Sequence, residues 1–144
     1  MIATVAVGTD GSGTAGQAVR SALDLAERFS ARIIFISAYE PVDETRLRRE
    51  KREAPPDIQW TINPEEDVEA TLREAEELAD GRGLEWASEA AMGEPAEVLV
   101  RLAEKHNADV LVIGNRGMNR RVLGSVPNSV THKAPCSVYL VKTT

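Results

Sequence analysis

The chain has 144 residues, of which 42% are hydrophobic and 28% charged, and this predicts one soluble domain that spans residues 1–144. Cys136 is the only cysteine, which excludes an intrachain disulfide, and the lack of a basic leader or a long apolar run predicts a cytoplasmic protein without membrane contact. A net charge of −6 argues against non-specific nucleic-acid binding.

The first forty residues predict a strand, a helix and a second strand. Residues 4–8 form a short apolar run that ends at a Thr-Asp-Gly turn. Apolar residues then recur at helical spacing over 15–29. Residues 32–38 are almost continuously apolar and rich in β-branched side chains, as expected of a strand that is buried on both faces.

Residues 39–62 break this pattern. Three prolines punctuate them, and nine of the eleven residues over 43–53 are charged. This composition predicts a flexible, solvated loop, with a lid or a partner-binding insert as the alternative. The next helix is expected to begin at Asn63-Pro64, an N-cap residue and a proline at the first helical position, with acids in the first turn.

The second half of the chain repeats the rhythm of strand and helix. Residues 84–91 predict a weaker strand, and Gly-Glu-Pro at 93–95 opens the next helix. The most apolar strand covers 110–114. A short helix over about 126–133 and a last strand over 137–141 complete the chain.

Five apolar strands that alternate with four helices predict an α/β fold. Right-handed crossovers would build a doubly wound, parallel five-stranded sheet with helices on both faces. Ligands of such sheets bind beyond the carboxyl ends of the strands, where the order of winding reverses. The residues just after each strand are therefore the first candidates for a site.

A glycine-bearing loop after the strand 110–114 is the strongest functional signal. Gly114 and Gly117 let backbone N–H groups approach a phosphate without interference from a Cβ atom. Gly124 and Ser125 open the last helix, whose N-terminus provides unpaired N–H donors and a favourable dipole. The spacing alone fits equally well a turn at the first two glycines and close packing at the third.

The charge distribution favours a bound polyanion in this region. Residues 110–144 contain no Asp or Glu and carry a charge of +5, so residues 1–109 carry −11, which is −6 minus 5. Arg116, Arg120 and Arg121 all lie within or beside the glycine loop. A polyanion would therefore bind to the C-terminal quarter of the chain.

Residues 11–16 match a second pattern, the three-glycine fingerprint of dinucleotide-binding folds. In that fingerprint the first glycine follows the strand almost directly, whereas here Thr9 and Asp10 intervene. Asp10 would also place a negative charge beside a pyrophosphate, and no catalytic domain follows. We therefore expect no nicotinamide or flavin cofactor.

Several motifs together resemble the universal stress protein A family. Its members carry Gly, two residues, Gly, about nine residues and then Gly-Ser or Gly-Thr between the fourth strand and the fourth helix, and residues 114–125 are similar to this motif. The segments 9–12, 93–95, 124–127 and 134–136 also look like family sequence. The resemblance covers nearly the whole chain except the charged loop. It implies a Rossmann-like fold and, for members with the glycine motif, binding of ATP or another adenine nucleotide.

The resemblance also implies a set of site residues. The set comprises Thr9, Asp10, Ala38, Gly114, Arg116, Gly117, Gly124, Ser125 and Val126. The first two would contact the nucleotide and Ala38 would line the adenine pocket. The glycines of the loop would approach the ribose and phosphates, and the start of the last helix would donate hydrogen bonds to the phosphates. Only six residues, 118–123, separate the second glycine from the third, about three fewer than in the family pattern, which leaves the reach of the loop open.

Asp10 has three possible roles. It would help to hold a magnesium ion through phosphate oxygens, accept a hydrogen bond from a ribose hydroxyl, or only shape the turn after the first strand. His106 and His132 are isolated from other ligand types in the sequence, so we assign them no metal site.

These features favour an adenine-nucleotide sensor or regulator in stress physiology. Three arginines suit a triphosphate, whereas the short loop favours the smaller cyclic AMP. We expect the charge of the arginines to decide, so that ATP binds more tightly than cyclic AMP. A slow ATPase would need a base and a positioned water that the sequence does not identify. A nucleotide-free interaction protein is the remaining alternative.

The last strand, 137–141, is expected at a sheet edge, and the resemblance implies a homodimer through it.

Overall fold

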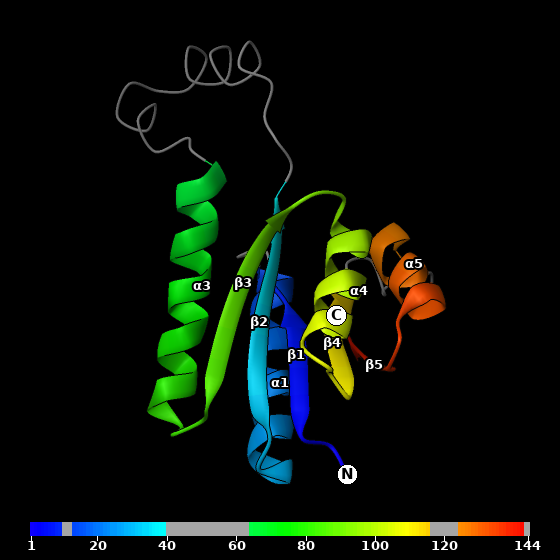
Figure 1. The fold of residues 1–144 in the computed structure, drawn as a ribbon. Helices are drawn as coiled ribbons and strands as arrows, with labels where there is room; N and C mark the ends of the chain where they lie inside the picture. Colours follow the sequence, from blue (N-terminus) through cyan, green and yellow to red (C-terminus); the bar gives the residue numbers. More distant parts are fainter. Residues whose placement is uncertain (10–12, 40–63, 116–123, 143–144) are drawn as a thin grey trace, which may run out of the picture.

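The computed structural model describes residues 1–9, 13–39, 64–115 and 124–142. Its elements follow the predicted order of strands and helices (Figure 1). They are β1 (Thr4–Gly8), α1 (Gly13–Phe29), β2 (Arg32–Tyr39), α3 (Pro64–Gly81), β3 (Trp86–Met92), α4 (Pro95–Lys105), β4 (Val110–Asn115), α5 (Ser125–Lys133) and β5 (Ser137–Lys142). Within these described ranges no helix has the length and apolar character needed to cross a membrane.

The third strand begins later than the sequence predicts, at Trp86, because the N–H of Leu84 completes the cap that follows α3. The Leu84 N–H donates to the Ala79 carbonyl at 3.0 Å, which is the long bond of a Schellman cap. Gly83 has a φ of +69°, a conformation that glycine adopts without strain. The cap therefore ends the helix cleanly and delays the strand.

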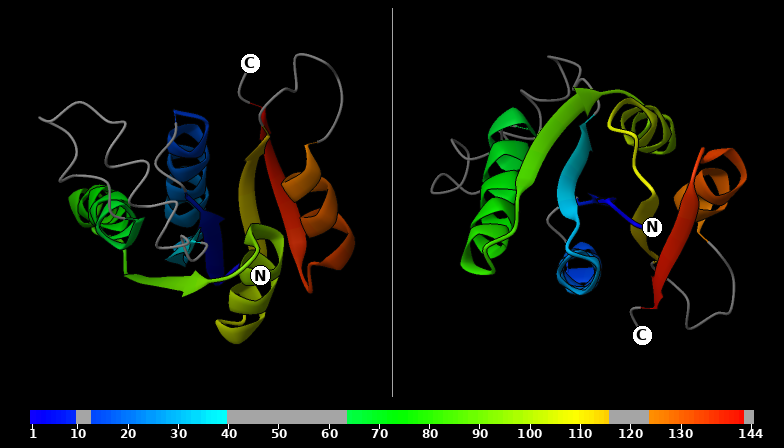
Figure 2. Two further views of the ribbon diagram at one scale, coloured as in Figure 1. Left: turned by 90° about the horizontal axis from the view of Figure 1, so that it is seen from above. Right: turned by 60° about the horizontal axis from the view of Figure 1, so that its bottom comes forward.

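All neighbouring strands of the sheet are parallel, in the order β3-β2-β1-β4-β5. The chain winds from β1 outward through β2 to β3, and then returns past β1 to β4 and β5. The strands β3 and β5 are thus the two edges (Figure 2). The predicted doubly wound fold is confirmed, and its winding reverses between β1 and β4.

Among the described elements, two helices cover each face of the sheet. Figure 2 shows α1 and α3 on one side and α4 and α5 on the other. Alternate strand residues point to opposite sides, so Val5 and Val7 pack beneath α1 whereas Ala6 packs beneath α4. Because both faces of the central strands are buried, these strands carry continuous apolar sequence, as Ile33 to Ile36 do.

The turn before α4 fixes where that helix begins. Gly93 has a φ of +146°, at which a side chain would be strained, and a Cβ atom there would lie 3.1 Å from Val98 Cγ2. The Glu94 carboxylate caps the helix by accepting two main-chain N–H bonds from its first turn. Pro95 then occupies the first helical position, beside the carboxyl ends of the strands.

The opposite end of the sheet is tied together by Asp109. Its Oδ2 accepts the N–H of Ala3 at 2.8 Å and the N–H of Thr4 at 3.0 Å. These two bonds hold the pKa of the Asp109 carboxyl below its ordinary value. The start of β1 is thereby joined to the residue that precedes β4.

Candidate functional site

A cavity of about 340 Å³ lies at the carboxyl ends of β1, β2 and β4. This is the edge at which the winding reverses, where open α/β sheets bind their ligands. The volume falls at the lower end of the range for small-molecule sites. Its lining consists of Gly8, Thr9, Ala15, Ile36, Ala38, Pro95, Leu99, Ile113, Gly114, Asn115, Gly124, Ser125, Val126 and Pro127.

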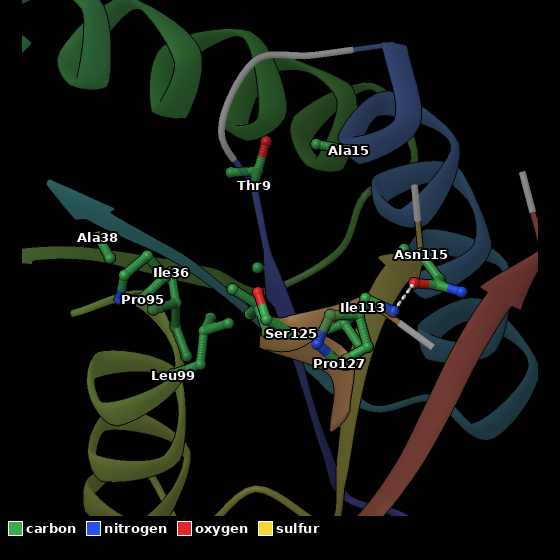
Figure 3. Close-up of a pocket in the computed structure, with 14 residues that line it drawn as sticks. Thr9, Ala15, Ile36, Ala38, Pro95, Leu99, Ile113, Asn115, Ser125 and Pro127 are labelled. Carbon is green, nitrogen blue, oxygen red and sulfur yellow. Dashed lines mark hydrogen bonds between the residues drawn. The ribbon is translucent and has the colours of Figure 1, made fainter. Parts of the chain in front are cut away.

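The cavity has an apolar end and a polar end. Figure 3 shows Ile36, Ala38, Pro95 and Leu99 gathered on one side, where β2 meets the start of α4. Asn115 lies on the other side, with Ser125 between the two groups. A ligand that fills the cavity would therefore have one apolar part and one hydrogen-bonding part.

Gly8 and Leu99 shape the apolar end together. A Cβ atom at Gly8 would lie 2.7 Å from Leu99 Cδ2, so close that the Leu99 side chain would have to move. Glycine is thus needed at the end of β1 so that the Leu99 side chain can pack against the strand. Leu99 is nearly buried and lines the cavity at the same time. Its packing against Gly8 keeps the cavity open.

Ala38 presents main-chain groups to the same end. The direction of N–H and C=O alternates along a strand, so those of Ala38 point the same way as those of Ile36, toward β1. The Ile36 carbonyl accepts the Thr9 N–H at 2.9 Å. β1 ends at Gly8, and no described residue bonds to Ala38 from that side. A donor and an acceptor are therefore left facing the cavity.

The start of α5 supplies the donors of the polar end. Gly124 is the N-cap and has no side chain to cap the helix. Ser125 and Val126 hold the first two helical positions, where N–H groups lack a carbonyl partner within the helix. Pro127 has no N–H, and the Asn128 N–H already donates to the Gly124 carbonyl at 3.0 Å. The helix thus offers two N–H groups and the Ser125 hydroxyl.

The N–H of Gly124 is not among these donors. It donates to Asn115 Oδ1 at 2.8 Å, the bond drawn as a dashed line in Figure 3. The sequence interpretation assigned Gly124 a direct bond to a phosphate, whereas its N–H has a protein partner in the structure. Asn115 is only 1% exposed and is the last residue of β4. The bond therefore connects the end of a strand to the N-cap of a helix.

Six of the nine site residues proposed from the sequence line this cavity. They are Thr9, Ala38, Gly114, Gly124, Ser125 and Val126. The other three, Asp10, Arg116 and Gly117, lie outside the described residues. The same holds for the loop 118–123 and for almost all of the charged segment 39–62.

Sequence reasoning missed the apolar lining and Asn115. Ile36 and Leu99 follow the same apolar pattern as the other residues of the core, so no signal separates them from it. Asn115 does carry a signal. It is a polar amide at the end of the most apolar strand and directly follows a glycine. A residue in that position is buried by the sheet and must find a hydrogen-bond partner.

Ionisable side chains are absent from the cavity wall as far as the structure describes it. Within the same described ranges, no group of three His, Cys, Asp or Glu residues is arranged to hold a metal ion.

His106, which the sequence places alone, in fact lies 2.9 Å from Glu89 Oε1. Lys105 and His106 hold the pKa of the Glu89 carboxyl below its ordinary value, with Lys105 the larger cause. This cluster joins β3 to the end of α4, outside the cavity wall.

Comparison with known proteins points to one family. The Universal stress protein family matches residues 1–142. A universal stress protein of Mycobacterium tuberculosis is 35% identical over 98% of this chain and 97% of its own length.

Two solved structures extend the comparison. A universal stress protein in complex with cAMP is 32% identical, with a TM-score of 0.72 over 99% of this chain and 98% of its own. A universal stress protein family protein of Arabidopsis thaliana with AMP bound has a TM-score of 0.74 over 99% and 92% of the two chains. At 16% identity the latter shows a common fold alone.

Proposed function

This chain belongs to the universal stress protein family, and from that premise we propose that its cavity binds an adenine nucleotide. The observation that carries the proposal is the pairing of an apolar end at Ala38 with helix donors at Ser125 and Val126 in one cavity. A base and a phosphate group require these two environments. The relative solved in complex with cAMP, at 32% identity, supports the same ligand class.

The proposed base position lies against Ala38. On one edge adenine offers a ring nitrogen acceptor beside an amino donor, which complements a main-chain N–H and C=O. Guanine offers a ring N–H donor beside a carbonyl acceptor, so the same pair of groups would repel it. Ile36 and Leu99 would supply apolar contact to the ring. The cavity should therefore prefer adenine to guanine.

The proposed phosphate position lies at the start of α5. The N–H groups of Ser125 and Val126 and the Ser125 hydroxyl would donate to phosphate oxygens, and the helix dipole would favour the negative charge. Thr9 and Gly114, at the ends of β1 and β4, would lie beside the ribose. The acid-free sequence after residue 110 removes the carboxylates that would repel such a ligand.

Within this class we propose ATP as the preferred ligand and cyclic AMP as the second candidate. Arg116, Arg120 and Arg121, which lie outside the described residues, favour the triphosphate, because charge-assisted bonds contribute about 1.5–3 kcal/mol each. Magnesium would then accompany the phosphates, with Asp10 as the proposed residue beside it. Cyclic AMP is favoured by the complex of the relative and by the small number of helix donors, which suit one phosphate group.

We propose that the protein is a cytoplasmic binding module, a sensor or regulator in stress physiology, rather than an enzyme. The described part of the cavity wall contains no ionisable side chain that could act as a general base. A slow ATPase would have to take its general base and its positioned water from residues other than these.

Calorimetric titration of the nucleotide-stripped protein tests the proposal. We expect ATP to bind more tightly than cyclic AMP, and GTP to bind at least about tenfold more weakly than ATP. Raising the ionic strength should weaken ATP binding more steeply than cyclic AMP binding, because more charge is screened. Failure of every adenine nucleotide to bind would refute the site. Tighter binding of cyclic AMP at low salt would overturn only the preference.

A further inference from the structure

We propose that Asn115 is a positioning residue that sets the affinity for the phosphate group while leaving the base end unaffected. This inference rests on the proposed adenine-nucleotide site. The bond from the Gly124 N–H to Asn115 Oδ1 is the observation behind it. Asn115 itself donates nothing to the ligand in this scheme. It acts through the helix that it holds.

The bond joins the end of β4 to the N-cap of α5 at the wall of the cavity. Asn115 is the last residue of β4, paired with Lys142 of β5, and its side chain is buried to 1% exposure. Gly124 is the N-cap of α5. A buried amide at the end of a rigid central strand therefore fixes the first residue of the helix. β4 is held by its neighbours in the sheet, and the Asn115 side chain holds Gly124 in a fixed position relative to β4.

The position of Gly124 decides where the helix donors point. Ser125 and Val126 follow it directly, so a displacement of Gly124 relative to β4 would move both of their N–H groups away from a common target. Gly124 has no side chain with which to cap the helix, and within α5 only its carbonyl is bonded, to the Asn128 N–H. Asn115 restrains its N–H from outside the helix.

Loss of the amide should affect one end of the cavity only. The groups around Ala38 belong to β2 and to the start of α4, which are held by the sheet register and by the Glu94 cap. None of these contacts involves Asn115. The expected signature is thus a lower affinity for a phosphorylated ligand with an unchanged affinity for its nucleoside.

The test compares AMP with adenosine by calorimetry in the wild-type protein and in Asn115→Ala. We expect the wild type to bind AMP more tightly than adenosine. In Asn115→Ala, AMP affinity should fall about tenfold, while adenosine affinity changes less than about twofold. The matched control is Ser88→Ala, which removes a partly buried hydrogen bond to Glu76, between β3 and α3. It should leave both affinities unchanged.

Amide hydrogen exchange provides a second measurement that does not depend on the ligand. The Gly124 N–H should exchange slowly in the wild type and rapidly in Asn115→Ala, whereas the Asn128 N–H, bonded within α5, should change little. If Asn115→Ala fails to fold, Asn115→Asp keeps an oxygen acceptor in the same place. That variant should protect the Gly124 N–H, bind adenosine normally and bind AMP more weakly, with the loss reduced by salt.

The possible results separate the two proposals. Wild-type protein that binds neither AMP nor adenosine overturns both of them. Wild-type binding with an unchanged ratio of the two affinities in Asn115→Ala overturns the role of Asn115 alone. An equal loss of AMP and adenosine binding would also overturn it, because a merely structural residue would produce that result.

Discussion

Ser125 stands at the first helical position of α5 with an exposed side chain, and its replacement tests the proposed phosphate position directly. Ser125→Glu should fold, because an acid at a helix N-terminus interacts favourably with the dipole. Its carboxylate would occupy the place of a phosphate, so ATP affinity should fall at least about tenfold. Asn128→Glu places the same charge on an exposed site one turn further along and should bind ATP nearly as well as the wild type. Equal affinity in Ser125→Glu would argue that the phosphate lies elsewhere.

Gly8 offers a second test at the scale of one residue. Gly8→Ala would push the Leu99 side chain away from β1, and the open space next to Leu99 is the cavity. Thermal unfolding should show a cost of about 1–3 kcal/mol, and calorimetry should show weaker nucleotide binding.

The matched control for this variant is Gly16→Ala in α1. An added Cβ atom at Gly16 meets no atom within 4 Å. This substitution should stabilise the helix by up to about 1 kcal/mol and leave binding unchanged. Nucleotide binding by Gly8→Ala at wild-type affinity would contradict the role assigned to Leu99.

At the scale of single residues, the sequence could predict the parts of the candidate site that are marked by a local sequence pattern. Glycine at the end of a strand and Gly-Ser before a helix are local signals, and Gly114, Gly124 and Ser125 do line the cavity. The partner of the Gly124 N–H could not be predicted. Asn115 is nine positions away, and only the fold decides which acceptor that N–H meets.

Asp109 joins two elements, the start of β1 and the start of β4, through hydrogen bonds that are stronger when its carboxyl is charged. Its pKa is lowered in the folded protein, so it contributes stability above the unfolded pKa of about 3.9, and this contribution is lost as the pH falls through the lower folded value. Asp109→Asn should therefore be less stable than the wild type in urea at pH 7. The difference should shrink below about pH 4. A difference that stays constant with pH would rule out the charge as its cause.

β5 is an edge strand of the sheet, and we predict that two copies of the chain form a homodimer through this edge. Tyr139 is 47% exposed there, whereas Leu140 packs partly against the α4 and α5 side of the core. Tyr139→Lys is thus the cleaner substitution, and it should shift the protein to a monomer in analytical ultracentrifugation. Phe29→Lys, at the end of α1, removes a similarly exposed aromatic residue and should leave the dimer intact. A dimer of unchanged strength in Tyr139→Lys would exclude this edge.

The elements themselves were largely predictable because their boundaries are set by local chemistry. Pro64 and Pro95 begin helices as expected, and the apolar runs at 4–8 and 110–114 are strands. The start of β3 was placed too early because Leu84 is apolar. Its N–H serves the cap of α3, which apolar periodicity cannot reveal.

On the scale of the whole molecule, both cores share one sheet, so the described fold should unfold as a unit. Nucleotide binding across the carboxyl edge should stabilise that unit. At a nucleotide concentration of 100 times Kd the gain is about 2.7 kcal/mol, or roughly 5–10 °C in Tm. Scanning calorimetry should show a single transition that moves upward with ATP in the wild type and not in Ser125→Glu. Two separate transitions would show that the cores unfold independently.

The contact between position 8 and Leu99 also limits how this chain can change over evolutionary time. A side chain at position 8 displaces Leu99 from its place against β1, so the two positions are not free to drift independently. The substitutions at positions 8 and 99 can occur in either order. If residue 99 is replaced first by a smaller residue, the intermediate sequence is not crowded, but it contains an enlarged cavity that lowers its stability. The other order passes through a chain whose cavity is partly filled by its own leucine. Selection for ligand retention would therefore preserve this glycine even where stability alone would tolerate its loss.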